Sequence, residues 1–122
     1  MSEIGTGKVV LVVEDDESIR ATLQEALESD GYAVVTAANG KEGMDALRRF
    51  PKTSVVLLDL MMPVMTGREF LDALLVDRVL GIIPVIVVSA NADEKTAAGA
   101  RAYLKKPADL EKLLALVSKF AV

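Results

Sequence analysis

The sequence contains neither cysteine nor histidine. Without cysteine, disulfide bonds, thiolate catalysis and cysteine-ligated zinc sites are excluded. Without histidine, the chain lacks the commonest general base and imidazole metal ligands, and it cannot relay a phosphoryl group through a histidine of its own. Aromatic residues are also scarce, at 4%, whereas apolar residues make up 52%. The interior is therefore expected to be aliphatic.

The length and charge of the chain restrict its class further. A chain of 122 residues suits one domain with a two-sided core. The net charge is −4 and no dense basic patch is present, which disfavours direct nucleic-acid binding. No apolar stretch approaches the roughly 20 residues of a membrane span, and no signal sequence is visible. We expect a cytoplasmic protein with one domain over residues 1–122, in which residues 1–7 are disordered or extended.

Five short apolar runs rich in β-branched residues predict strands. The runs are Val9–Val13, Ala33–Ala37, Ser54–Leu58, Val85–Val88 and Ala102–Leu104. They are mostly continuous rather than alternating, as expected for strands covered on both faces. The second and fifth runs are weaker, so we expect them nearer the edges of the sheet.

Helical periodicity fills the gaps between these runs. The first helix follows Ser18, a candidate N-cap, and the last begins near Asp109. The inward stripe of that last helix is predicted at Leu110, Leu113, Leu114 and Val117. Between Asn91 and Gly99 the pattern is only weakly helical. The alternation predicts a parallel sheet with helices on both faces, joined by right-handed crossovers.

Polar residues follow four of the predicted strands, at the edge where open α/β sheets form their sites. They are Glu14 and Asp15 after the first strand, Asp59 after the third, Ser89 after the fourth and Lys106 after the fifth. Taken singly, each has an ordinary explanation as a helix cap, a turn residue or a solvated lysine. Their coincidence at four strand ends favours a common site.

The residue types of this set suit phosphoryl transfer to a carboxylate. Two carboxylates about 4 Å apart repel by roughly 4 kcal/mol at an effective dielectric of 20, so the acids predict a divalent metal, Mg²⁺ or Mn²⁺. Asp59 is then a candidate nucleophile. Lys106 would stabilise the phosphoryl oxygens, and Ser89 would donate a hydrogen bond to the transferred group.

Four segments resemble the motifs of the receiver domains of two-component response regulators. Residues 12–20 resemble the acidic motif of the first strand, 57–67 the phosphoacceptor segment, 87–90 the Ser/Thr-Ala motif and 103–107 the Lys-Pro motif. The likeness covers essentially the whole chain in order and spacing. It implies a flavodoxin-like (βα)5 fold, a doubly wound five-stranded parallel sheet with strand order 2-1-3-4-5.

The same resemblance implies how the acids act. Asp59 would be the phosphoacceptor and, with Asp15, would bind Mg²⁺ through its side chain. Glu14 would contribute through a water molecule, and Met61 through its backbone carbonyl.

The resemblance also assigns the other motif residues. Lys106 corresponds to the family's lysine because it directly precedes Pro107, and their peptide bond would be cis. Ser89 would move toward the phosphoryl group, and Tyr103 would rotate into the space it leaves. An ordinary ring on a sheet edge explains Tyr103 equally well.

Two features depart from the family pattern. The stretch from Ser89 to Lys106 is several residues shorter than usual, so the fourth helix is expected to be short or irregular. The sequence also stops at the predicted fifth helix, so the output is expected from a partner protein or from an output domain outside this sequence. Leu116 and Phe120, off the inward stripe, would either contact a partner or pack at the helix end. Dimerisation is left open.

The leading hypothesis is a signalling switch that accepts a phosphoryl group from a sensor histidine kinase or phosphotransfer protein and hydrolyses it slowly. One alternative is a pseudo-receiver that binds protein without phosphorylation. Another is a phosphatase of the haloacid dehalogenase type, which is disfavoured because that family has an aspartate where this chain has Met61. Nucleotide hydrolysis is disfavoured because no glycine-rich phosphate loop follows the first strand.

Overall fold

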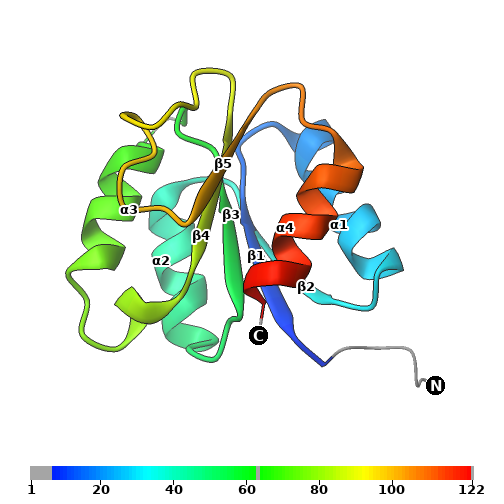
Figure 1. Ribbon diagram of the computed structural model, residues 1–122. Coiled ribbons are helices and arrows are strands. Elements are labelled where there is room, and N and C mark those ends of the chain that lie inside the picture. The colour runs from blue at the N-terminus through cyan, green and yellow to red at the C-terminus, as the bar shows by residue number, and fades with distance from the viewer. Residues whose placement is uncertain (1–6, 63, 122) are drawn as a thin grey trace.

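The computed structural model describes residues 7–62 and 64–121, and five parallel strands form one sheet in them (Figure 1). The strands are β1 (Val9–Val13), β2 (Ala33–Ala37), β3 (Val55–Leu58), β4 (Val85–Ser89) and β5 (Ala102–Lys105). Their order is β2-β1-β3-β4-β5, which confirms the predicted topology and the edge positions of the two weaker runs. Apart from Gly7, the expectation for residues 1–7 lies outside the described residues.

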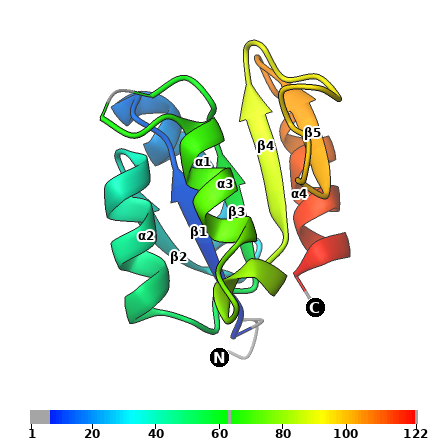
Figure 2. The same cartoon turned by 90° about the vertical axis from the view of Figure 1, so that its left-hand side faces the viewer.

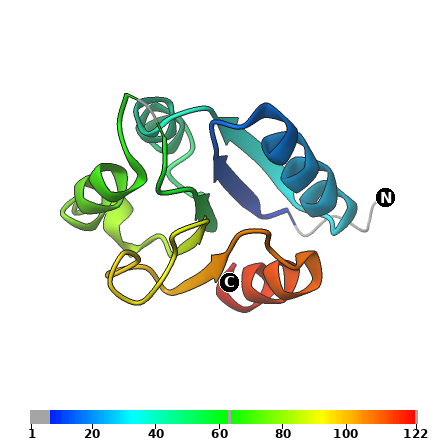
Figure 3. The same ribbon diagram turned by 90° about the horizontal axis from the view of Figure 1, so that it is seen from above.

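The helices cover both faces of the sheet, as Figures 2 and 3 show. They are α1 (Glu17–Ser29), α2 (Gly40–Arg49), α3 (Gly67–Leu75) and α4 (Leu110–Phe120), with a short 3-10 helix η1 (Leu80–Ile82) before β4. Helices α2 and α3 lie on one face, and α1 and α4 on the other (Figure 3). In the described part of the chain, no helix is long and apolar enough to cross a bilayer.

The continuous apolar strands supply two separate cores, because successive residues of a strand point to opposite faces. The core under α2 and α3 takes Leu11, Val13, Val56, Leu58, Val85 and Val87 from the strands. The core under α1 and α4 takes Val10, Val12, Val55, Leu57, Ile86 and Val88. The absence of a polar alternation in β1 and β3 is thus explained by burial on both sides.

Two expectations about the helices are wrong: the residue that caps α1 and the burial of Leu110 on α4. Asp16, not Ser18, caps α1, because its Oδ1 accepts from the N–H of Ile19 at 2.9 Å. Leu110 lies in the first turn of α4 and is 39% exposed, whereas Leu113 and Val117 of the same predicted stripe are fully buried and Leu114 is half-buried.

Two apolar residues of α4 lie outside its predicted inward stripe. Leu116 and Phe120 are half-buried and pack against the core under α1 and α4. Both side chains therefore pack at the helix end, which was one of the two explanations considered, and contact with a partner stays a prediction.

Residues 90–100, all of them described, form hydrogen-bonded turns instead of a helix. The N–H of Ala97 donates to Asp93 O at 3.0 Å and that of Ala100 to Ala97 O at 2.9 Å. Ala92 and Ala97 are buried against the α3 side of the sheet. The expected irregular fourth helix is therefore reduced to turns, so the label α4 belongs to the helix that follows β5.

Candidate functional site

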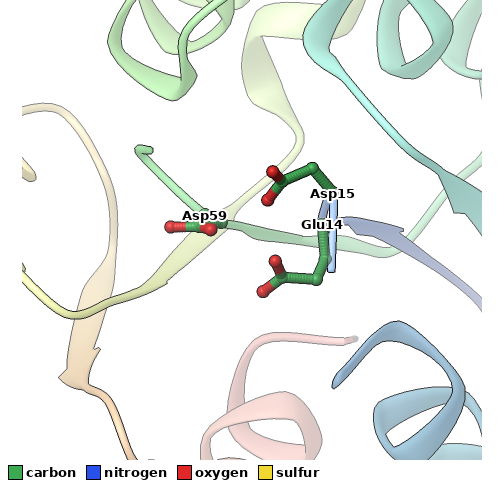
Figure 4. A group of neighbouring side chains, drawn as sticks. All are labelled: Glu14, Asp15 and Asp59. Carbon is green, nitrogen blue, oxygen red and sulfur yellow. The ribbon is translucent and has the colours of Figure 1, made fainter. Parts of the chain in front are cut away.

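The three acids lie together because their strands are neighbours. Strands β1 and β3 pair in parallel with Val13 opposite Leu58, so Glu14 and Asp59, the next residues on each, leave the sheet side by side. Oxygens of Glu14, Asp15 and Asp59 lie within 4.8 Å of one another, and Figure 4 shows the three side chains reaching into one region. Glu14 and Asp59 are buried, whereas Asp15 is exposed.

The backbone of the acids is held by the last hydrogen bonds of the sheet. The N–H of Glu14 donates to Ala37 O at 3.0 Å, and that of Asp59 donates to Val13 O at 3.1 Å. The backbone positions from which these two carboxylates extend are therefore held by hydrogen bonds of the sheet.

Gly67 allows the start of α3 to lie directly against the phosphoacceptor candidate. A Cβ atom at position 67 would collide with the carbonyl oxygen of Asp59 and the Cα of Leu60, and would lie 2.9 Å from the carbonyl carbon of Asp59. The N–H of Gly67 donates to Leu60 O at 3.0 Å. Only glycine permits this close backbone approach.

Lys106 reaches the acids from the end of β5 and bridges two of them. Its Nζ donates to Glu14 Oε1 at 2.6 Å and to Asp59 Oδ2 at 3.2 Å. The other oxygen of Asp59, Oδ1, accepts from the N–H of Met61 at 3.1 Å. Both carboxylate oxygens of Asp59 therefore have a fixed donor. The Lys106–Pro107 peptide bond is cis, as the resemblance implied.

The charges of this cluster shift two ionisation equilibria. Burial raises the pKa of Glu14, although the hydrogen bond from Lys106 opposes the shift. Burial by itself would lower the pKa of Lys106, but the hydrogen bond to Glu14 and the charge of Asp59 outweigh it, so that this pKa lies above its ordinary value. The lysine is thus held as a cation beside an excess of negative charge.

The acid cluster brings together ligands of the kind that fit a magnesium ion. Ligand oxygens around one Mg²⁺ lie about 3 Å apart when adjacent and about 4.2 Å apart when opposite, and the oxygens of the three acids lie within 4.8 Å of one another. Asp15 is exposed, which leaves the site open to a partly hydrated ion of the kind that Mg²⁺ prefers.

Of the other predicted site residues, Met61 contacts Asp59 through its backbone N–H, whereas Ser89 and Tyr103 lie on the neighbouring strands β4 and β5. Ser89 is fully buried at the end of β4, and its hydroxyl donates to Asn91 Oδ1 at 2.8 Å. Tyr103 lies on the edge strand β5 and is 40% exposed. The side chain of Met61 is 60% exposed, so the main chain of this residue is its part nearest to the carboxylate.

Two residues at the site were missed from the sequence. Arg20 on α1 donates through Nη1 to Glu14 O at 2.9 Å and to Asp15 O at 3.4 Å, and so ties the acidic loop to the helix. Asn91 accepts the hydroxyl of Ser89. The only signal for Arg20 was its position one turn after the cap Asp16; Asn91 had none, because its partner depends on the turn that follows β4.

A mostly apolar cavity of about 540 Å³ opens beside Lys106. Ile19 and Leu23 of α1 line one side, and Pro107 and Ala108 of the loop after β5 line the other. The cavity therefore joins the surface of α1 to the charged cluster.

Known proteins are similar to this chain in sequence and fold. The family described as the response regulator receiver domain matches residues 10–118. The chain is 40% identical to the uncharacterized transcriptional regulatory protein YkoG of Bacillus subtilis over 88% of this chain and 48% of YkoG. It is 37% identical to the protein PilH of Pseudomonas aeruginosa over 89% of this chain and 93% of PilH. The chain thus spans about half of the first relative and nearly all of the second.

Solved structures agree with these relatives. The chemotaxis protein CheY4 of Vibrio cholerae superposes with a TM-score of 0.84 at 32% identity, covering 94% of this chain and 99% of that one. A response regulator receiver protein from Pseudomonas putida superposes with a TM-score of 0.86 at 29% identity, covering 95% and 99%. Sequence, fold and site geometry lead to one conclusion: this chain belongs to the response regulator receiver domain family and is a signalling domain of two-component systems.

Proposed function

We propose that this single receiver domain accepts a phosphoryl group on Asp59 from a histidine kinase or a phosphotransfer protein. The observation that carries the proposal is the Lys106 ammonium, which bridges Glu14 and Asp59 at 2.6 and 3.2 Å. A cation inside an acid cluster that also suits a divalent metal is the arrangement that phosphoryl transfer requires. All of these groups lie at the edge where α/β sheets form their sites.

In the proposed transfer, a carboxylate oxygen of Asp59 forms a bond to phosphorus while the phosphorus–nitrogen bond of the donor's phosphohistidine breaks. The electron pair of that bond remains on the imidazole nitrogen of the donor. Lys106 would hold the phosphoryl oxygens and Ser89 would donate to one of them. Asp15, Asp59, the Met61 carbonyl and, through a water molecule, Glu14 would hold a magnesium ion, and the chemistry that such an ion supplies when bound is neutralisation of charge on the phosphoryl oxygens.

The phosphodonor protein is proposed to dock over α1 and the loop after β5. The apolar cavity between Ile19 and Pro107 would take an apolar side chain of the donor and seat its phosphohistidine next to Lys106. Its position beside the acceptor supports this choice, since the histidine must reach Asp59 while the domains remain bound.

The consequence of modification would be a change in affinity for a downstream protein or an output domain. A phosphoryl group brings nearly two negative charges, and allosteric coupling is typically about 1–3 kcal/mol, or roughly 5–150-fold in affinity. The domain would hydrolyse its own acyl phosphate slowly and would not act as a turnover enzyme. Tyr103, partly exposed on β5, would reorient with the modified state.

Acetyl phosphate, Mg²⁺ and intact-mass measurement test the proposal. The wild type is expected to gain one phosphoryl group that hydroxylamine removes, and Asp59→Asn is expected to gain none. Asp45→Asn is a matched control, because Asp45 is an exposed acid on α2 that forms a surface ion pair with Arg48. EDTA is expected to prevent the gain in the wild type.

An unchanged wild-type mass would favour a pseudo-receiver that only binds protein. Turnover of many equivalents of a phosphomonoester would favour the phosphatase alternative. An adduct that forms equally on Asp59→Asn would contradict the assignment of the acceptor.

A further inference from the structure

A chain of hydrogen bonds connects the buried hydroxyl of Ser89 with the outer surface of α3. The hydroxyl donates to Asn91 Oδ1 at 2.8 Å. The backbone oxygen of Asn91 accepts from Thr96 Oγ1 at 2.9 Å. The backbone oxygen of Thr96 accepts from Nη1 of Arg68, on the first turn of α3, at 3.2 Å. The turn segment at residues 91–97 is thus hydrogen-bonded at one end to Ser89 and at the other to α3.

Thr96 is the centre of this segment. Its N–H donates to Asp93 Oδ1 at 2.7 Å, and its hydroxyl oxygen accepts from the N–H of Asp93 at 2.9 Å. Asp72 holds the guanidinium of Arg68 in place at 2.6 Å. The turns therefore depend on a few specific side chains, because residues 90–100 have no helical backbone ladder of their own.

The hydroxyl of Ser89 can donate either to Asn91 or to a phosphoryl group, but not to both. A serine has a single O–H donor, and in this structure that donor is used by Asn91. A hydrogen bond to an ionised oxygen is roughly twice as strong as one between neutral groups. A phosphoryl group within reach would therefore take the hydroxyl away from Asn91.

We propose that Asn91 is the positioning residue that couples the site to residues 91–97, so that phosphorylation loosens this segment and its attachment to α3. The inference rests on the proposed phosphorylation of Asp59. Release costs little at Asn91 itself, because its side chain is exposed and water replaces the lost donor. The changed surface is then the turn segment together with Arg68, and not a fourth helix.

Hydrogen exchange of peptides covering residues 90–100 tests the coupling, with and without beryllofluoride and Mg²⁺ on the intact chain. In the wild type the exchange of this segment is expected to rise by about 2- to 10-fold on modification, the range that one neutral hydrogen bond can produce. In Asn91→Ala the segment is expected to exchange faster from the outset and to gain less than about 2-fold.

Two further variants separate the coupling from a general loss of structure. Thr96→Val is expected to behave as Asn91→Ala, and Thr96→Ser to restore the wild-type response, because serine keeps the hydroxyl. Glu94→Ala, an exposed neighbour outside the hydrogen-bonded chain, is expected to respond as the wild type does. Intact mass with acetyl phosphate is recorded for every variant, so that adduct formation is known independently.

The outcomes distinguish the two proposals. If the wild type forms no adduct, the proposed function fails, and this inference fails with it. If the adduct forms but the exchange of residues 90–100 does not change, or changes equally in Asn91→Ala, the coupling is refuted while the function stands.

Discussion

Replacing Lys106 by methionine removes the ammonium that bonds both Glu14 and Asp59 and keeps the unbranched shape of the side chain. The two carboxylates are 3% and 6% exposed and the lysine 19%, so neither acid can regain full hydration. Their nearest oxygens lie no more than 4.8 Å apart, and two unit charges at that separation repel by about 3.5 kcal/mol at an effective dielectric of 20. Breaking a buried ion pair from one side costs about 3–5 kcal/mol. We expect the free energy of unfolding to fall by about 3 kcal/mol at pH 7 in EDTA. This value is the lower end of the range for a broken buried ion pair, because the exposed Asp15 leaves the site open to water.

Urea unfolding followed by circular dichroism measures this loss, with Lys95→Met, at an exposed lysine, as the control. Magnesium at about 100 times its dissociation constant stabilises a folded protein by about 2.7 kcal/mol. We expect it to recover most of the deficit of Lys106→Met, because the ion would replace the lost cation between Glu14 and Asp59. The control is expected to lose almost nothing in either buffer.

The pH dependence provides a second check on the same variant. The folded pKa of Glu14 is raised above its ordinary value of 4.5, so the folded state binds this proton more tightly and ionisation destabilises it. Its contribution to stability therefore falls as the pH rises from 4.5 through the raised pKa. Loss of Lys106 removes two interactions that lower this pKa, so the folded pKa of Glu14 rises further in the variant. The difference in unfolding free energy between Lys106→Met and the wild type should therefore shrink as the pH falls. A variant as stable as the wild type in EDTA at pH 7, or a deficit indifferent to Mg²⁺ and pH, would refute the reasoning.

Three further substitutions have defined outcomes. Gly67→Ala is expected to cost about 3 kcal/mol or more, since the new methyl group meets the backbone of Asp59 and overpacking against main chain cannot relax; thermal unfolding measures it, and a stable variant would contradict the close approach. Val64→Gly is expected to raise stability by about 1 kcal/mol, because this 79% exposed valine has a φ of 69°, a left-handed conformation that costs a branched residue about 1–2 kcal/mol; an unchanged urea midpoint would argue against strain. Arg20→Ala is expected to weaken Mg²⁺ binding by about 10-fold in calorimetry, since the loop of Glu14 loses a charge-assisted hydrogen bond, and Arg20→Lys should recover part of it; equal affinity in all three proteins would exclude this role.

Burial on both faces is the reason that the fold could be predicted so far from the sequence. The three central runs, which form β1, β3 and β4, are buried on both faces, and helices between parallel strands are the common way to cover a sheet twice. The residues at which individual helices begin and end were harder to predict from the sequence. Asp16 rather than Ser18 caps α1, because both residue types can cap and only the direction of the incoming chain decides. Residues 91–99 form turns because their alanines give no stripe wide enough to hold a helix against α3.

The resemblance of four motifs to receiver domains supplied the strand order, and the pattern of the sequence itself determined the parallel sheet, the aliphatic double core and the gathering of Glu14, Asp15 and Asp59 at one edge of the sheet. These follow from periodicity and from strand ends that must meet at a common edge. Tertiary structure alone decided that Lys106 bonds Glu14 as well as Asp59, that Arg20 holds the acidic loop, and that Asn91 takes the hydroxyl of Ser89. The physical reason is that these bonds join atoms whose separation is set to tenths of an ångström by packing between elements, and hydrophobic patterning carries no information at that scale.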